Sequence, residues 1–138
     1  MTNSTDDAPK GELILYQTED GRTRIECRFE GETLWLTQAL MAELFQTTLQ
    51  NINLHLQNLY EEGELDPEAT IKSYLMVRTE GTRQVRRPVQ HYSLDAILAV
   101  GFRVRSHRGT QFRKWANARL SEYGFGVHDA AVSAFTML

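Results

Sequence analysis

The sequence has little that could cross-link the chain or place it in a membrane. Cys27 is the only cysteine, so an intrachain disulfide is excluded. No apolar run approaches the roughly 20 residues that a membrane-spanning helix needs. The N-terminal stretch MTNSTDDAPKG is polar and acidic, unlike a secretory signal. We therefore expect a cytoplasmic protein of one domain that has no membrane partner.

Patterns typical of enzymes and metal sites are also missing. The chain contains no P-loop, no GxGxxG and no HPF string. The histidines do not stand at ligand spacing from one another or from Cys27; they are His55, His91, His107 and His128. Cys27 alternates with apolar neighbours, which favours an inert buried thiol over a nucleophile. We expect no enzymatic activity, no catalytic residue, no metal and no cofactor.

Basic residues are scarce in the first half of the chain. Residues 1–71 hold 4 basic and 14 acidic residues, whereas residues 72–119 hold 11 basic and 2 acidic ones, a net charge of +9. The net charge of -3 for the whole chain hides this asymmetry. A polyanion is the natural partner for the basic half, and a solvated charged surface is the alternative.

The pattern of apolar residues predicts an α+β fold that begins with a β-meander. Three short strands are expected at residues 13–17, 22–29 and 32–36. The pairs Asp20-Gly21 and Glu30-Gly31 are typical of the turns between such strands. In the second strand apolar and charged residues alternate, which indicates that only one face is buried.

A hairpin and two helices are expected in the second half. Residues 71–78 and 83–92 predict the hairpin, in which Pro88 suits an edge position or the end of a strand. Ser93 is expected to cap one C-terminal helix, and another helix is expected to run from about Thr110 to Tyr123.

Between the meander and the hairpin, two short helices match a helix-turn-helix. Thr37 and Thr48 are suited to cap them. Counted from Gln38, the ninth position usually holds glycine because its φ is positive, but this chain has Gln46. The expected buried positions are Met41, Ala42, Phe45, Leu49 and Ile52.

The second of these helices carries an uncharged, amide-rich face within the window QTTLQNIN. Asn and Gln can bond adenine through a donor and an acceptor, and Thr can offer a hydroxyl or a methyl group. Ordinary surface amides are the alternative, although Glu and Lys stabilise helices better than Asn or Thr. If this helix enters a major groove, the expected base contacts are Thr47, Thr48, Gln50, Asn51, Asn53, Leu54 and His55.

The basic half supplies cations for a DNA backbone. A hairpin after a helix-turn-helix is a wing, whose arginines reach phosphates or a minor groove. The stretch Arg108-Gly109-Thr110 is expected to lead into a helix N-terminus, which favours an anion. Pairing with the acidic half is an equal alternative for Arg105 and Arg119. The expected backbone contacts are Arg78, Arg83, Arg86, Arg87, Arg103, Arg108, Thr110, Arg113 and Lys114.

Long blocks of the sequence resemble a known family. They are YQTEDGRTRIECRFEGETLWLTQALMAELFQTT, EEGELDPEATIKSYL, HYSLDAILAVGFRVRSHRGTQFRKWA and LSEY. Between Tyr16 and Tyr123 the chain resembles the RhuM-like virulence proteins of bacterial pathogenicity islands and mobile elements. This family is similar to the Bro and KilA DNA-binding domains of phage antirepressors, which share the FRKW pattern. Members are longer, so the resemblance implies a truncated member or a fragment.

Three segments are predicted: a disordered leader (1–11), a winged helix-turn-helix-like domain (12–124) and a C-terminal tail (125–138). The expected function is that of a sequence-specific DNA-binding module, a transcriptional regulator that acts as a homodimer on double-stranded DNA. The alternative is an antirepressor-like adaptor that binds a protein partner and no DNA.

Overall fold

The fold is α+β, as predicted, in a computed structural model that describes residues 11–124. Residues 1–10 of the expected leader and the whole expected tail lie outside the described residues. The elements in chain order are β1 (Glu12–Gln17), β2 (Arg24–Glu30), β3 (Thr33–Leu36), α2 (Gln38–Phe45), α3 (Leu49–Glu61), α4 (Pro67–Thr70), β4 (Ile71–Glu80), β5 (Arg83–Ser93), α5 (Leu94–Arg103) and α6 (His107–Glu122).

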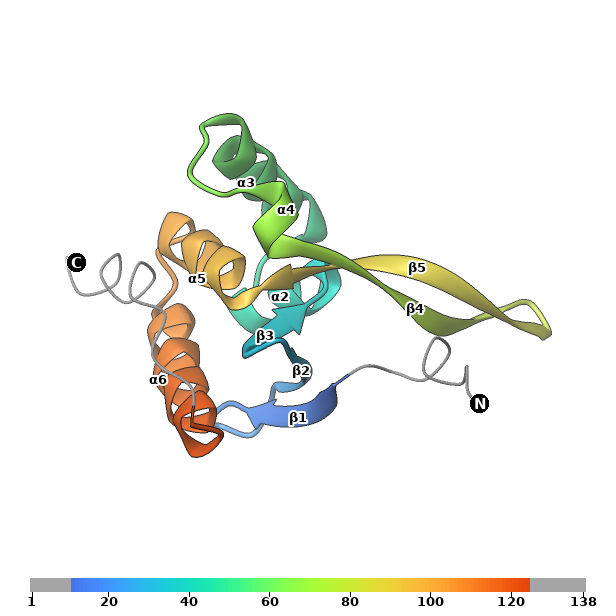
Figure 1. Cartoon of the computed structure of the whole chain (residues 1–138), viewed down its shortest axis with the longest axis horizontal. Helices are drawn as coiled ribbons and strands as arrows, with labels where there is room; N and C mark the ends of the chain where they lie inside the picture. Colours follow the sequence, from blue (N-terminus) through green and yellow to red (C-terminus); the bar gives the residue numbers. More distant parts are fainter. Residues whose placement is uncertain (1–10, 125–138) are drawn as a thin grey trace.

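The five strands form one antiparallel sheet in the order β1-β2-β3-β5-β4. Strand β5 pairs with β3 only through Trp35↔Ser93 and Leu36↔Tyr92, but it pairs with β4 from Arg83 to Tyr92. The two long strands therefore leave the rest of the molecule as a projecting ribbon (Figure 1). We call residues 73–90 the hairpin arm and the remaining described residues the body.

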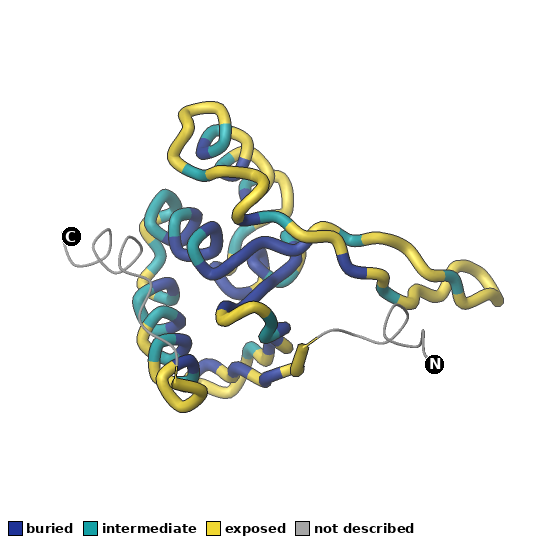
Figure 2. Tube along the Cα trace, in the orientation of Figure 1, coloured by how far each residue is buried: buried dark blue, intermediate teal, exposed yellow. Residues whose placement is uncertain are grey.

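The core of the body lies between the meander and the helices. In β2, Ile25 and Cys27 are fully buried, as the alternation predicts, but Arg28 of the predicted exposed face is buried as well. Tyr16 of β1 packs edge-on against Phe112 of α6, with ring centroids 5.1 Å apart. Figure 2 shows that buried residues gather in the body while the arm is almost wholly exposed. The hydrophobic effect that stabilises the fold therefore acts in the body.

Ser93 stands at the N-cap of α5, but its side chain does not accept the predicted capping hydrogen bond. Helix α5 continues through Gly101 because of a close contact with α2. A Cβ atom on Gly101 would lie 2.9 Å from Cζ of Phe45 and 3.5 Å from Cα of Gly109. Only glycine lets the Phe45 ring approach the helix so closely. This residue is thus explained by packing, although glycine lowers helix propensity.

Two boundaries differ in an informative way from the sequence predictions. Helix α6 begins at His107 and not at Thr110, because the Ser106 hydroxyl accepts a hydrogen bond from the Arg108 N–H and caps it earlier. Pro88 lies inside β5 rather than at its end. At this point β5 has β4 on one side only, so the expectation of an edge position is met there.

Candidate nucleic-acid interface

Helices α2 and α3 are joined by a tight turn centred on a left-handed residue. Gln46 has φ 57° and ψ 50°, and its N–H points to the carbonyl oxygens of Ala42 and Glu43. Thr48 then caps α3, because its hydroxyl accepts a hydrogen bond of 3.0 Å from the Asn51 N–H. The positive φ that normally calls for glycine is therefore present without glycine, at a cost of about 1–2 kcal/mol.

The contact between these two helices follows the prediction at four of its five positions. The buried ones are Met41, Ala42, Phe45 and Ile52. The prediction is wrong for Leu49, which is 52% exposed. Leu49 is the first residue of α3, and side chains of a helix lean toward its N-terminus. Its side chain therefore stays outside the buried contact with α2, and packing begins one turn later, at Ile52.

The predicted base-contact residues all lie at the surface. Thr48, Gln50, Asn53 and Leu54 are exposed, and the remaining three, Thr47, Asn51 and His55, are half-buried. The Asn51 side chain donates a hydrogen bond of 2.9 Å to the hydroxyl of Thr47. The amide-rich face of α3 is thus presented outward, with one pair of its members held together.

A chain of hydrogen bonds ties this face to the base of the arm. The Gln38 amide donates to the hydroxyl of Tyr92 at 3.0 Å and to Oδ1 of Asn53 at 3.3 Å. Tyr92 in turn donates to the Gln90 side chain at 3.0 Å. Sequence reasoning missed Gln38, Gln90 and Tyr92, because the central contact joins residues that are 54 positions apart. These hydrogen bonds connect α3 to β5 through Gln38 of α2.

A groove of about 570 Å³ separates the start of α3 from the arm. Leu49 lines it on one side, and Arg78 and Arg87 line it on the other. The Arg87 guanidinium makes two hydrogen bonds to Glu80, of 2.8 and 3.0 Å, and holds the pKa of that carboxyl below its ordinary value. The structure therefore brings two predicted backbone contacts beside the predicted reading helix.

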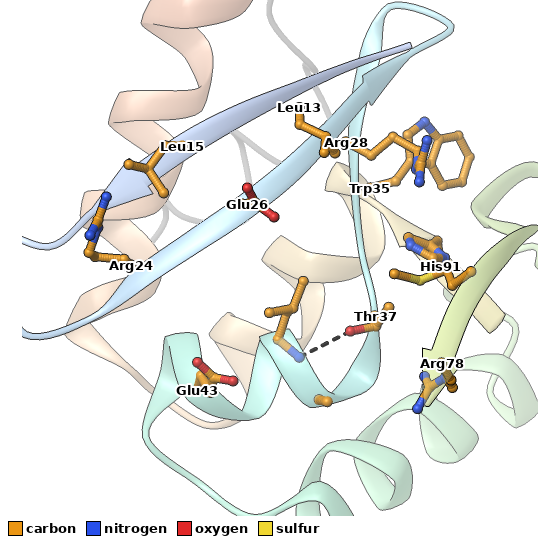
Figure 3. A pocket seen from close by; sticks show the side chains of 13 residues that line it. Leu13, Leu15, Arg24, Glu26, Arg28, Trp35, Thr37, Glu43, Arg78 and His91 are labelled. Carbon is orange, nitrogen blue, oxygen red and sulfur yellow. Dashed lines mark hydrogen bonds between the residues drawn. The ribbon is translucent and has the colours of Figure 1, made fainter. Parts of the chain in front are cut away.

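A second hollow, of about 640 Å³, lies on the other side of α2. Figure 3 shows Leu13, Leu15 and Arg24 of the meander facing it from one side, and Arg78 from the arm. Its lining mixes apolar, acidic and basic groups, so no single ligand class is indicated. Arg78 is common to both hollows, which places its side chain at the junction of arm and helix pair.

Residues 69–134 match the model of the Virulence protein RhuM family. The chain is RhuM-like. The match spans slightly less than half of the 138 residues and covers the arm, α5 and α6, whereas the α2–α3 pair precedes it. No curated protein and no solved structure shows a significant match.

Two arginines of the RhuM-like segment are engaged by the body rather than presented outward. Arg103 forms an ion pair of 2.6 Å with Glu62 and a second one with Glu64, which ties α5 to the end of α3. The half-buried Arg108 donates to the carbonyl of Leu44, and to the hydroxyl of Thr23 at 2.8 Å. Both were predicted as DNA backbone contacts, and the structure gives both a role in joining elements of the body.

The remaining predicted contacts of the RhuM-like segment fall on two separate surfaces. Arg83 and Arg86 are exposed on the arm. Thr110, Arg113 and Lys114 belong to α6, which lies on the opposite side of the molecule (Figure 1). The groove therefore lies beside arginines of the arm, and α6 lies apart from it.

Aromatic rings and cations hold the base of the arm to the body. The Arg28 guanidinium lies 4.3 Å from the centre of the Tyr74 ring, and Lys72 Nζ lies 5.1 Å from that of Trp35. The His91 ring meets Tyr74 edge-on at 4.9 Å and is only 4% exposed, and burial lowers its pKa. The two cation–π contacts are worth roughly 0.5–2 kcal/mol each. Arg28 and His91 of the body thus both contact Tyr74 at the start of the arm.

Other chemistry has few candidates among residues 11–124. No three His, Cys, Asp or Glu side chains gather there as a metal site. Cys27 is buried, which raises the pKa of its thiol to about 12. Within the same range, no helix has both the length and the apolar character to cross a bilayer.

Proposed function

We propose that this RhuM-like protein is a sequence-specific DNA-binding module that acts as a transcriptional regulator. In this proposal α3 enters the major groove and the arm is the wing. The observation that carries it is the groove lined by Leu49, at the start of the outward, amide-rich α3, and by Arg78 and Arg87 of the arm. The family description associates RhuM with virulence, and the regulated genes are proposed to belong to that setting.

The residues have distinct roles in this proposal. Gln50 and Asn53 are exposed amides, which can bond an adenine edge through two hydrogen bonds. Leu49 and Leu54 are 52% and 53% exposed and suit contact with thymine methyl groups. Phosphates are bound by the arginines of the arm, which position the module but do not read sequence. The arm arginines are Arg78, Arg83, Arg86 and Arg87.

The test compares three single substitutions in duplex DNA binding, measured by fluorescence anisotropy across a salt series. The duplex comes from selection out of a random pool with the unchanged protein. Gln50→Ala is expected to relax sequence preference, with a loss of about 1–3 kcal/mol on the selected site. Arg78→Ala is expected to weaken all duplexes alike and to lower the salt slope by about 1.

Lys114→Ala is the matched control, because it removes one positive charge from α6 on the opposite side of the molecule. It should leave affinity and salt slope unchanged. If Lys114→Ala and Arg78→Ala weaken binding equally, binding is not confined to the groove face. If the unchanged protein binds no duplex at 50 mM salt, the proposal is refuted.

A protein partner is the second candidate, favoured by the two exposed leucines of α3. Leu49 and Leu54 add apolar area to a face that carries no charge, and such a face also suits a protein surface. The purified protein then carries no nucleic acid, and its 260/280 absorbance ratio is that of protein alone. A raised ratio that nuclease treatment removes would instead favour DNA binding.

A further inference from the structure

Strand β4 offers an open backbone edge. Its ten residues pair with β5 on one side, and no other strand among residues 11–124 lies on its other side. Leu75 and Val77 on this strand are 51% and 60% exposed. An edge strand with exposed apolar side chains is a template for pairing with another strand.

We propose that two copies of the chain pair through their β4 edges, antiparallel, about a two-fold axis at Met76. In this register Lys72 lies opposite the partner's Glu80, and Leu75 lies opposite the partner's Val77. Tyr74, whose ring Arg28 already covers, lies opposite the partner's Arg78. Each of these contacts occurs twice because of the symmetry. The ten-residue edge is thus complementary to itself in charge and in apolar character.

Charge selects this register over its neighbours. In an antiparallel strand, only every second residue points its backbone N–H and C=O toward the free edge. The partner strand can therefore slide only by two residues at a time if these groups are to stay opposite one another. A shift that centres the axis on Leu75 sets Lys72 opposite the partner's Arg78, and like charges directly opposite are destabilising. A shift to Val77 removes Lys72 from the partner's Glu80. Only the Met76 register opposes lysine with carboxylate.

The other free edge of the sheet does not select a register in this way. Strand β1 has six residues, and Glu12 at its end is its only carboxylate or basic group. Its exposed residues Leu13 and Leu15 can meet a copy of themselves in more than one alignment. Among the two edges, β4 is therefore the one that specifies a defined pair.

The pair also fits the proposed function, and this step rests on that function. A two-fold axis perpendicular to the sheet turns both α3 helices to the same side. The two Ile71 residues, where β4 leaves each body, are then offset by ten residues, about 33 Å along the strands. Half-sites of helix-turn-helix dimers lie about 34–36 Å apart. One continuous ribbon would thus present two reading helices to successive turns of a duplex.

Charge reversal tests the pairing without DNA. Self-association of the full chain is measured by sedimentation equilibrium for the unchanged protein, Lys72→Glu, Glu80→Lys and the double variant. Each single change creates two pairs of like charges in the dimer, one at each symmetric contact, and is expected to weaken association about tenfold. The double variant restores opposite charges and is expected to associate more tightly than either single variant. The proposal is overturned if the double variant associates no more tightly than the single variants. It is also overturned if the unchanged protein stays monomeric throughout a 100-fold dilution series that starts at about 1 mM.

A cysteine scan tests the register itself. Met76→Cys places two thiols opposite each other and is expected to give a disulfide-linked dimer on mild oxidation. Leu75→Cys and Val77→Cys are the controls, because offset Cα atoms lie more than about 7 Å apart and cannot be bridged. The native Cys27 is buried and does not interfere. Cross-linking at position 75 or 77, or no cross-linking at position 76, contradicts the Met76 register.

These outcomes are separable from the DNA-binding test. Lys72 is not among the proposed DNA contacts, whereas Glu80 accepts two hydrogen bonds from Arg87, which is one of them. Both experiments here contain no nucleic acid, so their outcome does not depend on Arg87 binding a phosphate. A protein that dimerises through β4 but binds no duplex refutes only the proposed function. A protein that binds duplex as a monomer refutes only the pairing. Urea unfolding of each variant is the control that tests whether these substitutions leave the body folded.

Discussion

The body and the arm use the same kinds of residue in opposite ways. In the body, Arg103 and Arg108 bond to carboxylates, a hydroxyl and a carbonyl of neighbouring elements. In the arm, Arg83 and Arg86 are exposed at the surface, and Arg87 bonds to Glu80 of the arm itself rather than to the body. Apolar residues divide in the same way, because Ile97 of α5 is fully buried and Val77 of β4 is 60% exposed.

The difference shows where stability comes from. Burial of an aliphatic side chain stabilises a fold by about 1.5–3 kcal/mol, and nearly all such burial lies in the body. A two-stranded ribbon is marginal by itself, so the arm is stabilised at its base, where Tyr74 contacts His91 of the body. The residues beyond that base have little effect on folding and are available for contacts with a partner.

The largest effect is expected where the body is packed most tightly. Gly101→Leu inserts a side chain where a Cβ alone would meet the Phe45 ring at 2.9 Å. We expect the free energy of unfolding in urea to fall by about 3 kcal/mol because of overpacking. Ala118→Leu on the exposed side of α6 is the control and should change it little. Equal effects of the two would contradict the packing explanation of Gly101.

A smaller effect is expected from an arginine of the body. Arg108→Met removes hydrogen bonds to the Leu44 carbonyl and the Thr23 hydroxyl. We expect a loss of about 2 kcal/mol in urea unfolding, because the carbonyl loses a charged donor. Lys114→Met removes the same charge from an exposed position of the same helix and should be neutral. If Lys114→Met is as destabilising, overall charge and not the specific contacts explains the result.

The base of the arm should make stability depend on pH. Burial lowers the pKa of His91 below the ordinary 6.5, so between these two pKa values the unfolded state binds more protons than the folded state. Stability is therefore expected to fall as the pH drops from 7 through 6.5 toward the folded pKa. His91→Gln should flatten this part of a urea-midpoint profile, whereas His107→Gln, at an exposed position, should retain it. An unchanged profile in His91→Gln would disprove the assignment.

The smallest effect on folding is expected in the arm. Arg83→Ala removes an exposed side chain near the tip of the hairpin. The urea midpoint should stay the same within error, while the proposed DNA binding should lose one phosphate contact and about 1 from its salt slope. A clear loss of stability would mean that the arm is more tightly integrated with the body than its exposure indicates.

Local patterns predicted the elements well, because they depend on neighbours in sequence. Thr37 and Thr48 cap their helices through their own hydroxyls, as their positions before apolar stripes indicate. The amide-rich face of α3 also follows from helical spacing. Leu49 was placed wrongly because spacing alone does not tell where a helix begins to touch its neighbour.

The division of the arginines could not be predicted from the sequence. Arg103 meets a carboxylate 41 positions away, and Arg108 meets a hydroxyl 85 positions away. In the sequence, these residues and the arm arginines lie in the same basic half, and nothing in its composition distinguishes the two groups. Only the tertiary arrangement separates cations that join the body from cations that stay at the surface.

Because β3 and β5 pair over so short a stretch, the length of the arm can change independently of the packing in the body. Only two residue pairs connect the sheet of the body to the hairpin, so the ribbon beyond them can change in length without repacking the interior. Adding or removing one residue from each strand would extend or shorten it by about 3.3 Å. Related chains could thus adjust how far they span by insertions at Gly81 and Thr82, while the helices stay where they are.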